Sequence, residues 1–122
     1  TKEEMKMRKI EQKLIDAINN GSDYWDGGNT TLIRNFEEIL DYNTNTFRIN
    51  GDALRSVYLH GNHIADIDSN NKATANLESF YHWPTATTRS RLRALGINAS
   101  IKNFEACIDG VVITPSYLDW YC

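Results

Sequence analysis

The stretch from Trp83 to Gly96 constrains the fold of this chain more than any other. Pro84 favours an extended conformation at Trp83, and the threonines that follow offer hydroxyls to the unpaired N–H groups of a first helical turn. Gly96 suits the position just after a helix. We therefore expect a helix that begins near Thr85 to Thr87 and ends at Gly96.

The predicted helix has an apolar face and a basic one. Helical spacing places Thr88, Leu92 and Leu95 on one face. Arg89 and Arg93 share a neighbouring face, and Arg91 lies apart from both.

Charge is segregated along the chain. Between Ser79 and Phe104 there is no Asp or Glu, and the three arginines with Lys102 give this segment a charge of +4. Because the whole chain has a net charge of −3, the rest of the chain has a charge of −7. A short basic helix with free N–H groups at its start can bind phosphate or an acidic protein surface. Solvated arginines that pair with the acidic remainder are the alternative.

Aromatic residues come directly before this helix, from Phe80 to Trp83. Aromatic faces beside arginines can stack a base while the helix holds its phosphate, although aromatics beside a short helix also commonly belong to a core. The candidate residues for binding a ligand or a partner are Tyr81, Trp83, Thr88, Arg89, Arg91 and Arg93.

A second helix is expected at the N-terminus. Thr1 and Glu4 have the spacing of a capping box, and Asn19-Asn20-Gly21 is a helix end. The apolar stripe between them packs on the sheet of its own chain or pairs with a second subunit. The candidate dimer face is Met7, Ile10, Leu14 and Ile18.

The middle of the chain reads as strands and turns. Ser22 to Asn29 is turn-rich and is expected to be a loop, and Thr30 to Phe36 and Thr46 to Ile49 are β-like in composition. Glu37 to Tyr42 fits either a strand or a helical turn. Asp68 to Asn71 is a turn, followed by a third, weakly alternating strand over Lys72 to Glu78.

The clearest β signal is a hairpin formed by Leu54 to His60 and His63 to Ile67, with Gly61-Asn62 as its two-residue turn. His60 and His63 would then face each other at about 5 Å between Cβ atoms. Two histidines are at most half of a metal site, so we expect a cross-strand pair and no metal.

The last part of the chain predicts two short strands, Ile97 to Ile101 and Val111 to Ile113, around an Asp109-Gly110 hairpin signal. An aromatic tail of Tyr117, Trp120 and Tyr121 is expected to dock on the body. Cys107 and Cys122 are expected to be free thiols, with Cys107 buried.

These segments predict an α+β fold: an N-terminal amphipathic helix and an antiparallel β-meander with one short basic helix packed on it. A single domain over residues 1–122 is expected, with the helix in 1–21 and the α+β core in 29–122. No apolar run approaches the roughly 20 residues of a membrane helix, so an intracellular protein is expected. Without a phosphate-binding loop, an acid pair or a nucleophile beside a base, the sequence argues against catalysis and against a cofactor.

Two motifs carry a resemblance to a known family. The run from Tyr58 to Ala65, and later Trp83, Thr85 and Thr88 to Leu95, resemble small phage-encoded proteins that show L-H-G-N-x-I-A and then W-x-T-x-T-T-R-S-R-L-N-A-L. The resemblance covers about residues 29 to 104. It differs at Arg93, where asparagine is usual, and in the long N-terminal helix.

The resemblance implies a phage or prophage origin, presence in the bacterial cytoplasm, and a role in neutralising a host system. The first functional hypothesis is therefore a non-catalytic inhibitor of a bacterial defence or other host protein. The second is a nucleotide or nucleic-acid binder that uses the aromatic and arginine residues. The third is a structural module that dimerises through the N-terminal helix.

Overall fold

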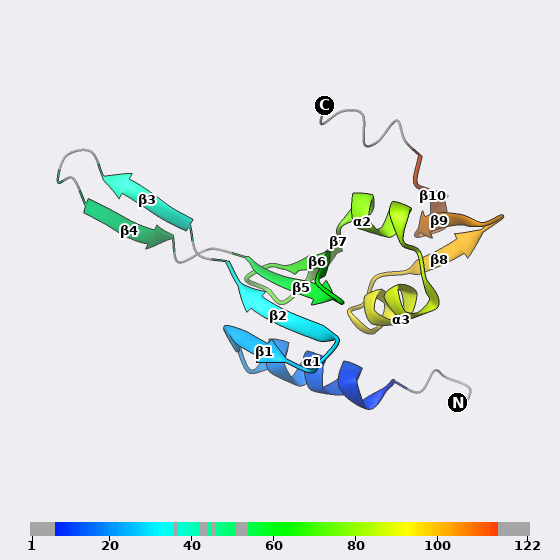
Figure 1. The fold of residues 1–122 in the computed structure, drawn as a ribbon, viewed down its shortest axis with the longest axis horizontal. Helices are drawn as coiled ribbons and strands as arrows, with labels where there is room; N and C mark the ends of the chain where they lie inside the picture. Colours follow the sequence, from blue (N-terminus) through cyan, green and yellow to red (C-terminus); the bar gives the residue numbers. More distant parts are fainter. Residues whose placement is uncertain (1–6, 36, 42–43, 45, 51–53, 115–122) are drawn as a thin grey trace.

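The computed structural model describes residues 7–35, 37–41, 44, 46–50 and 54–114 (Figure 1). The helices are α1 (Lys9–Asn19), α2 (Leu77–His82) and α3 (Ala86–Ala94). The strands are β1 (Tyr24–Asp26), β2 (Thr30–Arg34), β3 (Glu37–Asp41), β4 (Thr46–Asn50), β5 (Arg55–Leu59), β6 (Asn62–Ile67), β7 (Ala73–Ala75), β8 (Ala99–Lys102), β9 (Glu105–Ile108) and β10 (Val111–Val112).

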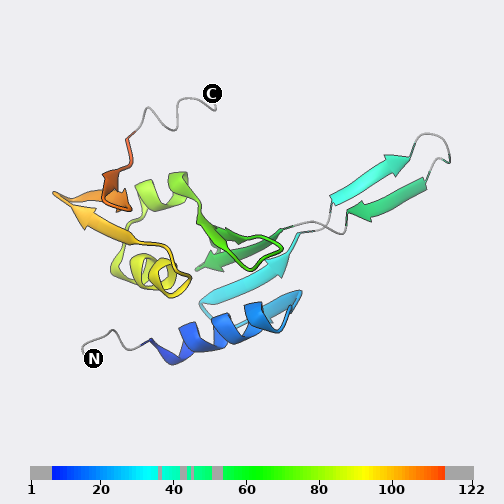
Figure 2. The ribbon, with the colours of Figure 1, turned by 180° about the vertical axis from the view of Figure 1, so that it is seen from behind.

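The strands form antiparallel sheets, which together with the helices confirm the predicted α+β class. The largest sheet has the order β1-β2-β5-β6-β7, and a three-stranded sheet has the order β10-β9-β8. The β3–β4 hairpin forms a sheet of its own and extends away from the rest of the molecule (Figures 1 and 2). The division into one domain over residues 1–122 stays a prediction.

Helix α1 begins later than the sequence suggested. Arg8 is extended, with φ −68° and ψ 153°, so the helix starts at Lys9, and the proposed capping box at Thr1 lies outside the described residues. Its end is as predicted, because the N–H of Gly21 donates to the Ile18 carbonyl and that of Ser22 to Ala17.

The loop expected between α1 and β2 contains a strand. Tyr24 to Asp26 pair with Thr31 to Ile33, and the Gly27 N–H donates to the Thr30 carbonyl at 2.8 Å to close the turn. The aromatic pair Tyr24-Trp25 therefore belongs to β1, which the turn-forming residues around it concealed. The ambiguous stretch 37–42 is a strand over the described residues Glu37–Asp41.

The central hairpin forms where the sequence predicted it, but its turn is shifted by one residue. Leu59 pairs with Asn62, so the turn residues are His60 and Gly61, with φ 52° and 81°. The expectation that His60 and His63 face each other is therefore wrong. His63 pairs with Tyr58, and its Nε2 lies 2.7 Å from Asp66 Oδ1.

The third strand of the meander is shorter than predicted. It ends at Ala75, and the residues expected to continue it begin α2, which the sequence did not reveal. Asn76 caps this helix, since its Oδ1 accepts the Ser79 N–H at 3.1 Å. The turn at Asp68 is confirmed: its Oδ1 accepts N–H groups from Asn70 and Lys72.

Helix α3 confirms the prediction of a helix that begins near Thr85 to Thr87 and ends at Gly96. Thr85 is the N-cap, and its Oγ1 accepts the Thr88 N–H at 3.1 Å. At the other end the Gly96 N–H donates to Arg93 and the Ile97 N–H to Leu92, with Gly96 at φ 90°. These two bonds form the paired helix stop that glycine permits.

The C-terminal region contains a strand that the sequence reading omitted. Glu105–Ile108 pairs with β8 through a turn at Asn103-Phe104 and with β10 through the predicted turn at Asp109-Gly110. Cys107 is buried as expected. The aromatic tail, including Tyr117, Trp120 and Tyr121, and also Cys122 lie outside the described residues.

One hydrophobic core joins α1 to the sheets. The buried side chains of α1 belong to one cluster with residues of β2, β5, β6, α2, α3 and the small sheet. Its largest fully buried apolar members are Leu14, Leu32, Ile67, Phe80 and Leu92. The inner part of the apolar stripe, Leu14, Ala17 and Ile18, thus packs on its own chain, and pairing with a second subunit stays a prediction.

The cap of α3 gives a stability prediction. We expect Thr85→Ala to lower the free energy of unfolding by about 1 kcal/mol, because the Thr88 N–H loses its acceptor. Thr87→Ala, inside the same helix, should leave stability unchanged or raise it by a few tenths of a kcal/mol, since alanine has the higher helix propensity. Urea denaturation of both variants checks this, and equal effects of the two would contradict the capping role.

Candidate partner-binding surface

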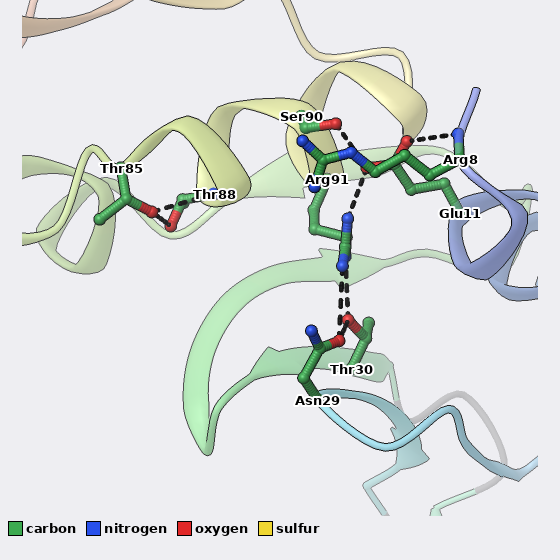
Figure 3. A network of polar contacts seen from close by, with 8 residues as sticks. All are labelled: Arg8, Glu11, Asn29, Thr30, Thr85, Thr88, Ser90 and Arg91. Atoms are coloured by element: carbon green, nitrogen blue, oxygen red, sulfur yellow. Dashed lines mark hydrogen bonds and ion pairs between the residues drawn. The ribbon is translucent and has the colours of Figure 1, made fainter. Parts of the chain in front are cut away.

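Arg91 is buried in the middle of a polar network and does not lie on the surface (Figure 3). Arg91 is 2% exposed, and its Nη1 donates to Glu11 Oε2 at 2.6 Å. Its Nε donates to Thr30 Oγ1 at 2.9 Å, and its Nη2 to Asn29 Oδ1 at 3.4 Å. The guanidinium therefore joins α3 to α1 and to the start of β2.

Glu11 is buried with Arg91 and has further donors. Ser90 Oγ donates to Oε2 at 2.6 Å, and the Arg8 backbone N–H donates to Oε1 at 3.2 Å. Burial raises the pKa of this carboxyl, but the hydrogen bonds from Ser90, the Arg8 N–H and Arg91 outweigh it and lower the pKa below its ordinary value. Glu11 is thus a carboxylate at neutral pH, and Ser90 is fixed as its donor.

This placement removes Arg91 from any accessible basic face. The sequence named it as a partner-binding residue because nothing nearby in the chain could neutralise it, yet its counter-ion comes from α1, 80 positions away. The positive charge of Arg91 is paired with Glu11 inside the protein, so it does not contribute to the basic surface expected from segment 79–104.

Breaking the pair should destabilise the protein strongly. We expect Arg91→Met or Glu11→Leu alone to cost about 3–5 kcal/mol of unfolding free energy, because each leaves a buried unpaired charge. The double variant should recover a large part of that loss. A double-mutant cycle by guanidinium denaturation measures this, and single variants that cost less than about 1 kcal/mol would contradict the buried pair.

The lowered pKa of Glu11 gives a pH prediction. A carboxyl whose pKa is lower in the folded state stabilises the fold above its ordinary pKa of 4.5, and this contribution is lost as pH falls through the folded value. The stability difference between the wild type and Glu11→Gln should therefore be constant near neutral pH and narrow below pH 4.5. Thermal unfolding of both proteins across that range checks it, and a difference independent of pH would be the contrary result.

The other two arginines of α3 remain at least partly accessible. Arg93 is exposed, and its Nε donates to the Ala99 carbonyl of β8 at 2.8 Å. Arg89 is half-buried, and its Nε has no hydrogen-bond partner among the described residues. Within the described part of the chain neither arginine has an ion-pair partner, so their charge is available to a ligand or partner.

Trp83 lines two cavities, and these arginines line neither of them. A cavity of about 430 Å³ is lined by Trp83 with residues of β6 and α2. A smaller one of about 190 Å³ is lined by Trp83, Thr85 and Thr88 with residues of the central hairpin. Neither lining includes Tyr81, Arg89, Arg91 or Arg93. The structure therefore brings Trp83 and Thr88 together and offers no support for a base and phosphate held jointly by Trp83 and the arginines.

The proposed dimer face is divided by the fold. Leu14 and Ile18 are buried in the core of their own chain, whereas Met7 is exposed and Ile10 is intermediate. Only the start of this stripe thus has surface to offer a second copy.

The most exposed apolar side chain among the described residues is one that the sequence reading missed. Phe104 is 97% exposed at the tip of the β8–β9 hairpin. It has φ 67° and Asn103 has φ 52°, so both turn residues lie in the left-handed region. A bulky residue in that region is a genuine outlier. The available signal was a phenylalanine directly after an asparagine between two strand-like runs.

The register of the small sheet shows which of its apolar residues share a face. Ile108 is opposite both Ala99 and Val111, and Ile101 is opposite Ala106, so these residues share one face of the small sheet. Ala99 and Ala106 are buried in the core, while Ile101 and Val111 are exposed at the margin of that face. Of the two exposed residues, Ile101 is the nearer to the Phe104 turn, whereas Val111 is opposite Ile108 at the other end of β9.

The fold is that of a small α+β protein built on antiparallel hairpins and closed by short helices. A model of the Kyanoviridae Gp96 protein family matches residues 7–120, which is nearly the whole chain, and the chain belongs to this family. It is a phage protein, as the resemblance implied. The match begins before α1, so that helix is no addition to the family pattern. Comparisons with curated proteins and with solved structures gave no match.

Two further observations concern the described residues only. None of their helices is long and apolar enough to cross a membrane. No group of three or more histidine, cysteine or acidic side chains among them is placed to hold a metal ion.

Proposed function

We propose that this phage protein is a non-catalytic accessory protein that inhibits a bacterial defence or other host protein by binding it, with Phe104 as the central anchor. The observation that supports this is the exposed phenylalanine in a turn that disfavours it. Strained residues that a fold does not require are a reason to suspect a functional side chain.

Two other turns of the same chain provide the comparison. The hairpins β5–β6 and β9–β10 also have two-residue turns with positive φ at both positions, and each has glycine second: His60-Gly61 and Asp109-Gly110. Glycine takes this conformation without steric cost, whereas a side chain with a Cβ is strained there. At the equivalent position of the third turn stands Phe104. Folding alone would favour glycine at this position too.

The exposed ring suits insertion into an apolar pocket of another protein. Burying a phenylalanine contributes about 1.5–3 kcal/mol, and aromatic residues at the centre of an interface commonly dominate its binding energy. Ile101, near the turn, extends the apolar contact, and Arg93, whose Nε donates to the Ala99 carbonyl at the other end of β8, offers a charge for a carboxylate further along the same sheet. The partner is therefore a protein with an apolar pocket beside acidic groups.

The host side of the proposal rests on the phage family. We propose that this phage protein acts in the host bacterial cytoplasm, with a host protein as its target. Arg89 and Arg93 remain part of the proposed surface. Arg91 does not, because it is buried.

The test uses a substitution that should improve folding and abolish binding. Phe104→Gly creates an Asn-Gly turn, the preferred pair for this geometry, and should raise the free energy of unfolding by several tenths of a kcal/mol. It should also weaken partner binding about 30-fold or more, as expected for loss of an anchor worth 2 kcal/mol. Denaturation gives the first value, and quantitative pull-down from host lysate followed by calorimetry with the captured protein gives the second.

Asn103→Gly is the matched control. It relaxes the neighbouring position of the same turn and keeps the ring of Phe104, so it should retain the partner at wild-type affinity. A Phe104→Gly protein that captures the same host protein as strongly as the wild type would overturn the proposal. The proposal would also be overturned if Phe104→Gly is more stable than the wild type and still inhibits that host protein as strongly.

A further inference from the structure

The larger cavity beside Trp83 is built mainly by one short helix. Glu78, Ser79 and His82 lie on α2, with Glu78 and His82 four residues apart, and Trp83 is the C-cap that follows; all four side chains line one wall. Asn62 and His63 at the start of β6, with Asn76, form the other wall. Trp83 is 54% exposed, and its indole is the largest apolar surface of the lining.

Part of the lining is fixed by internal hydrogen bonds. His63 Nε2 faces Asp66 Oδ1 at 2.7 Å, and its Nδ1 faces Asn76 Nδ2 at 3.4 Å. Asn76 Oδ1 is occupied by the Ser79 N–H, which sets the direction of this amide. The Asp66 carboxylate also accepts from Ser56 at 2.8 Å. The wall formed by His63 and Asn76 is therefore held by internal hydrogen bonds, and these two side chains have little hydrogen-bonding capacity left for a ligand.

The rest of the lining can contact a ligand. Asn62, Glu78 and the hydroxyl of Ser79 have no hydrogen bond to another described side chain, and Glu78 is exposed at the rim. The ring of His82 contacts those of Tyr81 and Trp83. Neither lysine nor arginine lines the cavity, and Glu78 is its one carboxylate among the described residues. An anionic ligand would meet a carboxylate there without a compensating cation, so phosphate is disfavoured.

From this combination we propose that the Trp83 cavity binds a guanidinium group. A cation above an indole face is attracted by the ring quadrupole, and tryptophan is the best side chain for this contact. The Glu78 carboxylate, which lines the same cavity, can add a charge-assisted hydrogen bond to such a cation. Guanidinium fits better than ammonium because it is planar, stacks on an aromatic face, and donates in a fork that matches a carboxylate.

The ligand is an arginine side chain of a polypeptide or a small guanidinium compound, which share this chemistry. The site uses none of the residues of the Phe104 surface, so its success or failure is independent of the proposed inhibition.

The test is a titration of the full-length protein followed by NMR at the indole N–H of Trp83. We expect saturable shifts with the blocked tripeptide Gly-Arg-Gly and with agmatine. The same tripeptide with citrulline, which has nearly the same shape and no charge, should bind at least tenfold more weakly. Tighter binding of the arginine tripeptide than of agmatine identifies a polypeptide as the source, and equal or weaker binding identifies a small molecule.

Matched variants locate the site. Glu78→Gln removes the charge with little change in shape and should weaken binding of the arginine tripeptide at least fivefold, whereas Glu105→Gln, an exposed carboxylate of β9 outside the cavity, should not. Trp83→Leu should abolish binding, followed then at the backbone N–H signals of Asn62 and Ser79. Equal binding of the citrulline peptide overturns the proposal, as does a response to adenosine monophosphate or glucose without one to the arginine tripeptide.

Discussion

The buried contact between Glu11 and Arg91 fixes how α1 and α3 are placed against each other and against the start of β2. Removing two charges from water costs several kcal/mol for each ion, so such a pair is favourable only where the remaining donors and acceptors are also satisfied. Here Ser90 and the Arg8 N–H complete the carboxylate, and Thr30 and Asn29 complete the guanidinium. Because these partners come from α1, α3 and the start of β2, all of them are satisfied in one relative placement of the three segments. A core of aliphatic side chains alone would tolerate small shifts of α1 more readily.

A second buried arginine holds the opposite end of α1. Arg55 of β5 donates through Nη1 to the carbonyls of Ile18 and Ser22, at 3.1 and 3.2 Å, and through Nη2 to Asn71 at 2.6 Å. The last carbonyls of a helix carry partial negative charge, and a cation there is stabilising. The two ends of α1 are thus bound by arginines from separate parts of the chain. Between them Leu14 and Ile18 fill the core, which explains why this helix packs within its own chain.

Local signals were sufficient for much of the fold. The limits of α3, the end of α1, the central hairpin and the Asp109-Gly110 turn all depend on residues within a few positions of one another, and each was readable. The failures have a common cause. The three residues of β1 are surrounded by turn-forming residues and are stabilised by pairing with β2, and α2 is a six-residue helix whose first two residues were assigned to the preceding strand. The one-residue shift at His60 followed from assigning the turn by its glycine without the register of the strands.

The candidate site illustrates the same division between local and distant information. A basic helix was visible in the sequence, but which of its arginines is exposed depends on Glu11, and no spacing rule links positions 80 apart. Phe104 was overlooked for the opposite reason: as an isolated aromatic residue it reads as core, and only the register of β8 and β9 places it at the tip of a turn. The comparison of its turn with two other turns of the chain then gives the strongest argument about function. Where two turns of this protein have the glycine that their geometry favours, the third has a ring exposed to solvent at a cost to folding, and a cost of that kind is expected where the side chain has a use outside the fold.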